Sequence, residues 1–186
     1  KYFNIPMIGA SPFKLINEIG VNNDLQLINK NLRIIEAAYK KAPYYKDVYP
    51  IVEEILKCGK NDIAGYIEES FKVINKYLGI STELIVSSNL KKDCSLKGQD
   101  KVLQICGLLG ATEYYNAVGG QELYSFDAFE KHGIKLKFLN TKEIIYDQFG
   151  QTFQPNLSII DVMMFNSVEE IMTYLNRSEE HTSELQ

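Results

Sequence analysis

The chain has 186 residues, of which 45% are hydrophobic and 24% are charged, and it carries a net charge of −4. This length fits one globular domain with a sizeable core. The acidic balance excludes a basic surface of the kind that binds nucleic acid or anionic lipid. No apolar run is long enough to span a membrane and no secretory signal is visible, so we expect a cytoplasmic protein without membrane insertion.

The first half of the chain is predicted to be helical after a short extended start. Tyr2–Met7 alternates apolar and polar residues as a strand does, and Lys14–Val21 is a weaker strand candidate. Apolar residues then recur at helical spacing in several runs that are flanked by capping or stop residues. These runs are Leu25–Tyr39, Tyr49–Lys57 and Asp62–Leu78, the last followed by Gly79 where a left-handed cap is needed.

The second half alternates strand and helix patterns. Strands are predicted over Thr82–Val86, Glu113–Val118 and Ile134–Leu139, separated by helices over Asp100–Leu109 and Phe126–Lys131. Two closing helices follow, over Leu157–Phe165 and Val168–Leu175. Strands that alternate with helices form parallel sheets covered by those helices. We therefore expect one α/β domain over residues 1–176, with a mostly parallel sheet in a Rossmann-like three-layer arrangement and a helical segment near the N-terminal half.

The end of the chain has a different origin in our interpretation. Arg177–Gln186 matches, residue for residue, the in-frame translation of a common sequencing-adapter oligonucleotide. A natural, charged terminal helix is the alternative. We expect a non-native tail that adds nothing to the fold, and His181 is left out of the functional argument. Since Lys1 is not a methionine, we also expect the chain to be a gene fragment.

Two polar loops that follow predicted strands are candidates for ligand binding. Ser87 and Ser88 come directly after the first of these strands, and Gly119 and Gly120 come after the second. In an open α/β sheet, ligands bind beyond the carboxyl ends of parallel strands, where hydroxyls and backbone N–H groups hold phosphate or carboxylate. A right-handed crossover between the two strands would bring both loops to one sheet edge. A local turn or cap stays open for the serines, and a tight turn for the glycines.

A third polar group surrounds the start of the first closing helix. Ser158 or Asn156 can cap this helix, with Asp161 at the third position of a capping box. Asp161 lies among apolar residues, so its carboxylate is either solvated or paired, and a general-base role is a second interpretation. We expect it to lie within reach of the Ser87 or Gly119 loop. The whole group is Tyr146, Gln148, Pro155, Asn156, Ser158 and Asp161.

Metal and thiol chemistry have little support in the sequence. Cys58, Cys94 and Cys106 lack metal-ligand spacing and are interpreted as reduced structural thiols. His132 ends a predicted helix, where an imidazolium suits the negative end of the helix dipole. Tyr39 and the tyrosines after it are interpreted as a packing edge, with sugar stacking as the alternative. The sequence identifies no cofactor.

Four ordered segments resemble the WbqC-like family of bacterial surface-polysaccharide gene clusters. The first is YKKAPYY at Tyr39–Tyr45, and the second joins LGIST at Leu78–Thr82 to SSNL at Ser87–Leu90. The third runs from LQIC at Leu103–Cys106 through GATEYY, GGQELY and GIKL, and the fourth runs from YDQ at Tyr146–Gln148 through FQPNLSIID to FN at Phe165–Asn166. The ordered set, more than any single motif, carries the resemblance. The family's usual His-Gln-Pro start is absent, and Asn31 stands where members often carry a histidine.

The resemblance implies a transferase of O-antigen or capsule synthesis that acts on an activated or nucleotide-linked sugar. In that interpretation Asp161 is the catalytic residue, and the anionic or sugar part of the small-molecule substrate binds the strand-end loops. The substrate-binding set is Ser87, Ser88, Gly119, Gly120, Tyr124, Gln148 and Asn156. The rival is a non-catalytic binding or assembly subunit of the glycan machinery, which predicts an exposed apolar patch and no enclosed polar cleft.

Overall fold

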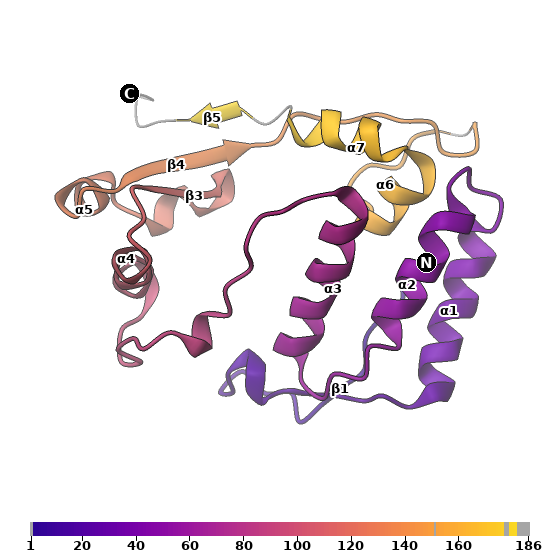
Figure 1. Cartoon of the computed structure of the whole chain (residues 1–186), viewed down its shortest axis with the longest axis horizontal. Helices are drawn as coiled ribbons and strands as arrows, with labels where there is room; N and C mark the ends of the chain where they lie inside the picture. Colours follow the sequence, from indigo (N-terminus) through magenta and orange to yellow (C-terminus); the bar gives the residue numbers. More distant parts are fainter. Residues whose placement is uncertain (1, 151, 177–178, 182–186) are drawn as a thin grey trace. The chain divides into compact units, whose positions relative to one another are not determined.

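The computed structural model describes residues 2–150, 152–176 and 179–181, and the chain divides into two compact units (Figure 1). The first unit joins Lys1–Leu84 to Ile145–Thr173, and the second consists of Ile85–Ile144 with Tyr174–Gln186. The segment Ile85–Ile144 of the second unit is therefore inserted between the two segments of the first. The Asp161 region belongs to the first unit, and the Ser87 and Gly119 loops belong to the second.

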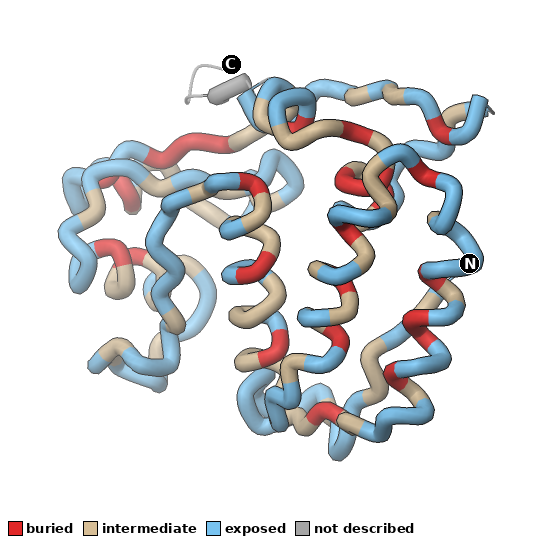
Figure 2. Tube along the Cα trace, turned by 45° about the vertical axis from the view of Figure 1, so that its right-hand side comes forward, coloured by how far each residue is buried: buried red, intermediate tan, exposed pale blue. Residues whose placement is uncertain are grey.

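The first unit is built mainly from helices that share one apolar core. The long helices are α1 (Leu25–Tyr39), α2 (Tyr45–Leu56) and α3 (Ile63–Leu78), and the closing segment adds α6 (Ile159–Phe165) and α7 (Val168–Leu175). Figure 2 shows buried residues in red at intervals along the long helices. The core includes Ile35, Val48, Val52, Met163, Met164 and Ile171. Burial of each such side chain contributes about 1.5 to 3 kcal/mol.

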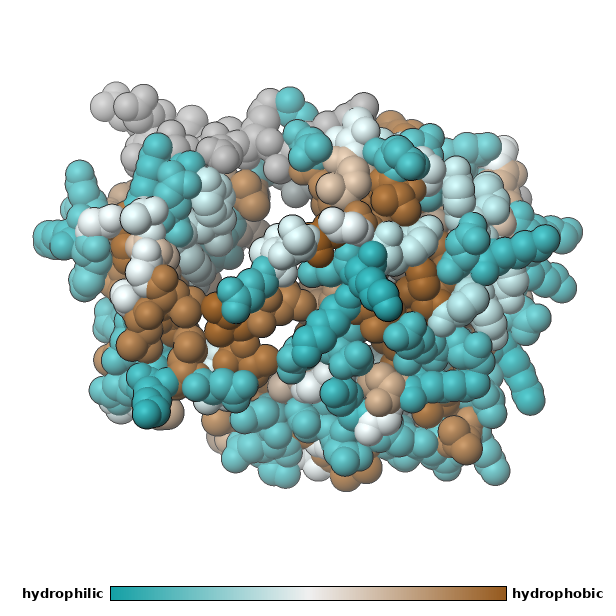
Figure 3. Space-filling model, viewed as in Figure 1, coloured by the Kyte–Doolittle hydropathy of each residue, from teal (hydrophilic) through white to brown (hydrophobic). Residues whose placement is uncertain are grey.

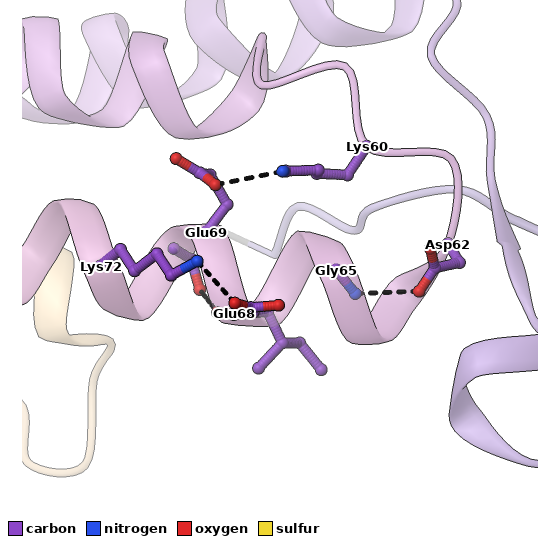
Figure 4. Close-up of polar contacts among 8 residues, drawn as sticks. Lys60, Asp62, Gly65, Glu68, Glu69 and Lys72 are labelled. Carbon is purple, nitrogen blue, oxygen red and sulfur yellow. Dashed lines mark hydrogen bonds and ion pairs between the residues drawn. The ribbon is translucent and has the colours of Figure 1, made fainter. Parts of the chain in front are cut away.

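Capping fixes where these helices begin and end. The Asp24 carboxylate accepts a hydrogen bond from the Gln26 amide at 2.7 Å, and that of Asp62 accepts one from the Gly65 amide at 2.9 Å (Figure 4). Gly79 ends α3 in the left-handed region at φ 70°. The predicted start of α2 is wrong, because the helix begins at Tyr45 and contains Pro50 within it. Figure 4 also shows Lys60 paired with Glu69 at 3.3 Å.

The extended start of the chain forms much less strand than the alternation predicts. The strands β1 (Met7–Ile8) and β2 (Gly20–Val21) pair antiparallel over two residues each. A 3₁₀ turn, η1 (Ile16–Glu18), lies between them, and Gly20 forms a bridge to Asp62. This small ribbon therefore holds the N-terminal segment against the start of α3.

The second unit contains one parallel strand pair with helices packed on it. The strands β3 (Glu113–Ala117) and β4 (Lys135–Asn140) are parallel, and α5 (Phe126–Lys131) lies between them in sequence. The other elements are α4 (Gly98–Leu108) and the 3₁₀ turns η2 (Ser87–Asn89) and η3 (Val118–Leu123). The buried core consists of Leu103, Cys106, Phe129, Ile134, Leu136 and Phe138.

A short strand from the tail pairs with this sheet. Glu179–His181 forms β5, which runs antiparallel to β4 with His181 opposite Phe138. We expected a tail that adds nothing to the fold, and this backbone pairing with β4 was not predicted.

The predicted three-layer, mostly parallel sheet is wrong. The described strands form one sheet in the order β1-β2 and another in the order β3-β4-β5, and only β3 and β4 run parallel. Thr82–Val86 is not a strand, and Leu84 and Ile85 keep 38% and 47% of their surface exposed. A β-rich run becomes a strand only where a neighbouring strand and a packing surface are available.

Large apolar side chains also remain at the surface. Figure 3 shows such hydrophobic side chains among hydrophilic ones on one face. On α3, Ile67 and Phe71 are one helical turn apart and are 42% and 53% exposed. Within the described ranges, no helix combines the length and the hydropathy that crossing a membrane requires.

Candidate functional site

A buried carboxylate near the start of α6 is the centre of the candidate site. Ser158 caps this helix, since its hydroxyl accepts a hydrogen bond from the Ile160 amide at 3.3 Å. Asp161 lies in the first turn and is 3% exposed, so of the two alternatives, solvated or paired, the structure excludes the solvated one. That it lies within reach of the Ser87 or Gly119 loop stays a prediction. Burial of a carboxylate costs several kcal/mol unless hydrogen-bond donors replace the lost water.

Three side chains donate hydrogen bonds to Asp161. The Tyr39 hydroxyl donates to Oδ1 at 2.9 Å, and the Tyr146 hydroxyl donates to Oδ2 at 2.7 Å. The Gln148 amide also donates to Oδ2, at 2.7 Å. Among the residues that the structure describes, no cation pairs with this carboxylate, so these donors carry its stabilisation. Each hydrogen bond to a charged group contributes about 1.5 to 3 kcal/mol.

Aromatic packing and a second amide contact hold these donors in place. The Tyr146 ring lies edge-on to Phe153 at 5.1 Å, and the Tyr39 ring packs against Phe165 at 6.1 Å. The Gln148 side-chain oxygen accepts a hydrogen bond from the Gln154 amide at 2.7 Å. The loop before α6 is therefore held against Asp161 by the hydrogen bonds from Tyr146 and Gln148.

The electrostatics of the cluster keep Tyr39 neutral. Burial, followed by the hydrogen bond to Asp161, raises the pKa of Tyr39 well above its usual value of about 10. The phenol therefore stays protonated at neutral pH and donates a hydrogen bond to the Asp161 carboxylate. Its oxygen keeps lone pairs that can accept a hydrogen bond from a ligand hydroxyl.

A groove of about 670 Å³ lies against the same tyrosine. One wall comes from α1 and the N-terminal segment, and the other comes from the residues that precede and begin α6. Asn156, which adopts a positive φ of 58°, and Ser158 supply polar groups to an otherwise apolar and aromatic lining. The residues that line the groove include Phe3, Ile34, Tyr39, Asn156, Ser158 and Ile160. Tyr39 thus connects the buried carboxylate to the groove.

The structure divides the predicted site residues between the two units. Gln148, Asn156 and Asp161 lie in the first unit, where Gln148 and Asp161 are bonded to each other and Asn156 lines the groove. Ser87, Ser88, Gly119, Gly120 and Tyr124 lie in the second unit. Because Thr82–Val86 is not a strand, the serine and glycine loops are not the ends of neighbouring strands, and that prediction is wrong.

The second-unit residues have local contacts of their own. Ser87 and Ser88 are exposed in η2, where Lys92 donates a hydrogen bond to the Ser87 carbonyl. A Cβ on Gly120 would lie 2.9 Å from the Asn116 side-chain amide, so this glycine allows close packing. A Cβ on Gly119 would meet nothing within 4 Å.

Aromatic packing accounts for Tyr124. Its ring lies edge-on to Phe129 at 5.8 Å, and its hydroxyl lies 3.4 Å from that of Tyr114. Substrate contacts for these second-unit residues stay a prediction.

Sequence reasoning missed the part that Tyr39 plays. It grouped Tyr39 with a packing edge, and the ring does pack against Phe165, but its hydroxyl reaches a carboxylate 122 positions later in the chain. No local pattern encodes such a contact, although Tyr146 and Asp161 did fall in one predicted group. His132 fits its predicted structural place, since its Nδ1 lies 2.8 Å from the Ala128 carbonyl oxygen.

The donor chemistry of the cluster is that of neutral hydroxyls and amides around one carboxylate. In the part of the chain that the structure describes, no group of three or more histidine, cysteine, aspartate or glutamate side chains could hold a metal ion. The cluster can therefore orient a phenol and accept or donate hydrogen bonds at the groove.

Comparison with known proteins gives one match. The sequence profile of the WbqC-like protein family matches residues 1–173. The match includes the groove and the Asp161 cluster, and it stops before Arg177–Gln186. No curated protein and no solved structure matches the chain.

Proposed function

Since the chain belongs to the WbqC-like protein family, we propose that it is a transferase of bacterial cell-surface polysaccharide biosynthesis. It acts in the cytoplasm on an activated or nucleotide-linked sugar. The family membership is one support for this proposal. The other is the groove in which Tyr39 is backed by a buried, triply hydrogen-bonded carboxylate. Such clusters fix a polar group in a geometry that a solvated side chain would not keep.

The groove suits a sugar because it combines apolar walls with a few polar groups. Sugar rings present C–H faces that pack on aromatic and aliphatic surface, and hydroxyls that need directed partners. In this proposal the Tyr39 oxygen accepts a hydrogen bond from a sugar hydroxyl, and the Asn156 amide bonds a second one. Ser158 remains the helix cap, with its hydroxyl at the groove wall.

Asp161 has a supporting part in this proposal. Its two oxygens already accept three hydrogen bonds, and it is not one of the residues that line the groove. We assign it as a positioning residue that orients Tyr39, with Gln148 beside it. The catalytic role predicted for Asp161 stays a prediction, and the proposal does not depend on it.

The test is ligand-detected NMR of a panel of nucleotide-linked sugars with the wild-type chain, Tyr39→Phe and Asn156→Gly. Glycine at position 156 adopts the positive φ without strain and removes the whole side chain, including the amide. One donor of the panel is expected to bind the wild-type chain and to bind each variant about tenfold more weakly. Ser70→Ala on α3 is the control, because it removes a hydroxyl that lies outside the groove lining.

Turnover separates the transferase from its rival. Release of the nucleotide or other leaving group from the bound donor, in the presence of an acceptor, supports the transferase. Binding that depends on Tyr39 but never leads to release would identify a non-catalytic binding subunit. The proposal is refuted if no donor of the panel binds the Tyr39→Phe variant more weakly than the wild-type chain.

A further inference from the structure

The groove beside Tyr39 offers few hydrogen-bonding side chains to a ligand. Among the described residues that line it, four end in a polar group, namely Tyr2, Tyr39, Asn156 and Ser158, and none carries a charge. Tyr2 is 98% exposed, so solvent surrounds it and the other three supply the polar groups of the wall. The rest of the lining is aliphatic or aromatic.

The hydrogen-bonding capacity of these three groups is already partly used. The Tyr39 hydroxyl donates to Asp161, so towards a ligand it can only accept. The Ser158 hydroxyl accepts from the Ile160 amide, which leaves its own O–H free to donate. The Asn156 side chain has an acceptor oxygen and a donor NH₂ group. The wall can therefore pair with only a few hydroxyls of a ligand.

An ordinary hexose carries more hydroxyls than this wall can pair, because most of its ring carbons bear one. A hydroxyl held against apolar surface loses its water partners without a replacement, whereas a methyl group in the same place buries apolar area. Leu157 provides such a surface next to Asn156, since it lines the groove and is 50% exposed. The composition of the groove therefore favours a sugar in which an apolar group replaces a hydroxyl.

We propose that the sugar bound beside Tyr39 carries a methyl-bearing group in place of one hydroxyl, and that this methyl group packs on Leu157. This inference rests on the proposed function and adds the class of sugar to it. A deoxy sugar, with a methyl group instead of the terminal hydroxymethyl group, has this chemistry, and so has an acetamido sugar. The amide of an acetamido group can also pair with the Asn156 amide. The remaining ring hydroxyls then bond to Tyr39 and Ser158.

Methyl glycosides are the probes, because they test the sugar site without a nucleotide. The methyl glycosides of glucose and of galactose are each compared with their deoxy and acetamido forms, by ligand-detected NMR with the full chain. We expect at least one methyl-bearing form to bind about tenfold more tightly than its parent hexose. Preference for the deoxy form or for the acetamido form shows which of the two groups supplies the methyl.

Leu157→Asn tests the placement of the methyl group. Asparagine has a similar shape, and its amide gives a ligand hydroxyl the partner that leucine lacks. We expect the preference for the methyl-bearing form to fall from about tenfold to less than about threefold. Leu175→Asn is the matched control, because Leu175 is also 50% exposed and does not line the groove. This control should keep the full preference.

Equal binding of the methyl-bearing and parent forms, or binding by none of the glycosides, overturns the inference. So does a preference that Leu157→Asn leaves unchanged, since the methyl group would then pack elsewhere. A nucleotide-linked donor that still responds to Tyr39→Phe in those cases leaves the proposed function standing. Methyl-selective binding without any donor that responds to Tyr39→Phe has the opposite meaning, because it supports the sugar class and refutes the transferase.

Discussion

Asp161 and Tyr39 illustrate how a polar side chain can be buried at the edge of an apolar core. The carboxylate lies on α6 between Ile160 and Val162, where the helical stripe alone would suggest a hydrophobic residue. Its three donors come from α1 and from the loop before α6. The hydrogen bond from Tyr39 also gives its phenol one fixed orientation at the groove. The same side chain therefore stabilises the fold and forms part of the candidate binding site.

This arrangement predicts a stability loss for Asp161→Asn. Asparagine keeps the shape but turns one acceptor oxygen into a donor, which then faces a hydroxyl or amide that also donates. We expect the free energy of unfolding, measured by urea denaturation, to fall by about 2 to 3 kcal/mol. Asp47→Asn is the control, because Asp47 is an exposed acid on α2 and should change stability by less than about 0.5 kcal/mol. Equal, small effects for the two variants would show that the cluster tolerates the loss of charge.

At the scale of elements, the sequence predicts helices better than strands. Most helices appear within a few residues of their expected bounds, because their stripes, caps and stops are local signals. Strands need partners that the sequence does not name. The predicted strand Ile134–Leu139 pairs with β3 and forms β4. Thr82–Val86 has a similar β-rich pattern but does not pair with a strand and is irregular. The predicted placement of Ser87 and Gly119 at neighbouring strand ends is wrong because that strand is missing. Tyr146, Gln148 and Asp161 do meet, as members of a group that is close in sequence.

The end of α3 offers a test of one such local signal. Gly79 adopts φ 70°, and a Cβ there would meet nothing within 4 Å, so only backbone strain opposes a larger residue. Gly79→Ala should lower the free energy of unfolding by about 1 to 2 kcal/mol. Gly79→Asn should lower it by clearly less, because asparagine tolerates the left-handed region. Indistinguishable losses in thermal denaturation would mean that the conformation of this cap does not limit stability.

At the scale of the whole molecule, the chain forms a mainly helical first unit and a second unit built on a parallel strand pair. The first unit brings together residues from both ends of the matched region, and the second is inserted between them. Sequence patterns did not indicate this insertion, because periodicity describes single elements and not which elements pack together. The groove and the Asp161 cluster both belong to the first unit. The proposed activity can therefore be tested on its residues without reference to the second.

The tail provides the last prediction. Deletion of residues 177–186 removes β5, and with it the backbone hydrogen bonds that Glu179–His181 makes to β4. Each such bond has a net value of about 1 kcal/mol, and fixing the backbone of each residue costs about 1 to 2 kcal/mol, so the two effects nearly offset. The buried side chains of β4, Leu136 and Phe138, pack in the core with Leu103, Cys106 and Phe129, and the deletion leaves those residues in place.

We therefore expect deletion to shift the Tm by less than about 2 °C, in line with a non-native tail. Ile171→Ala is the control for sensitivity. Ile171 on α7 is 2% exposed and lies in the core of the first unit, so this variant should lose about 2 to 5 kcal/mol of stability. A fall of more than about 4 °C on deletion would mean that β5 stabilises the second unit by 1 kcal/mol or more. That result would mean that the segment Arg177–Gln186 stabilises this fold, whatever the origin of its sequence.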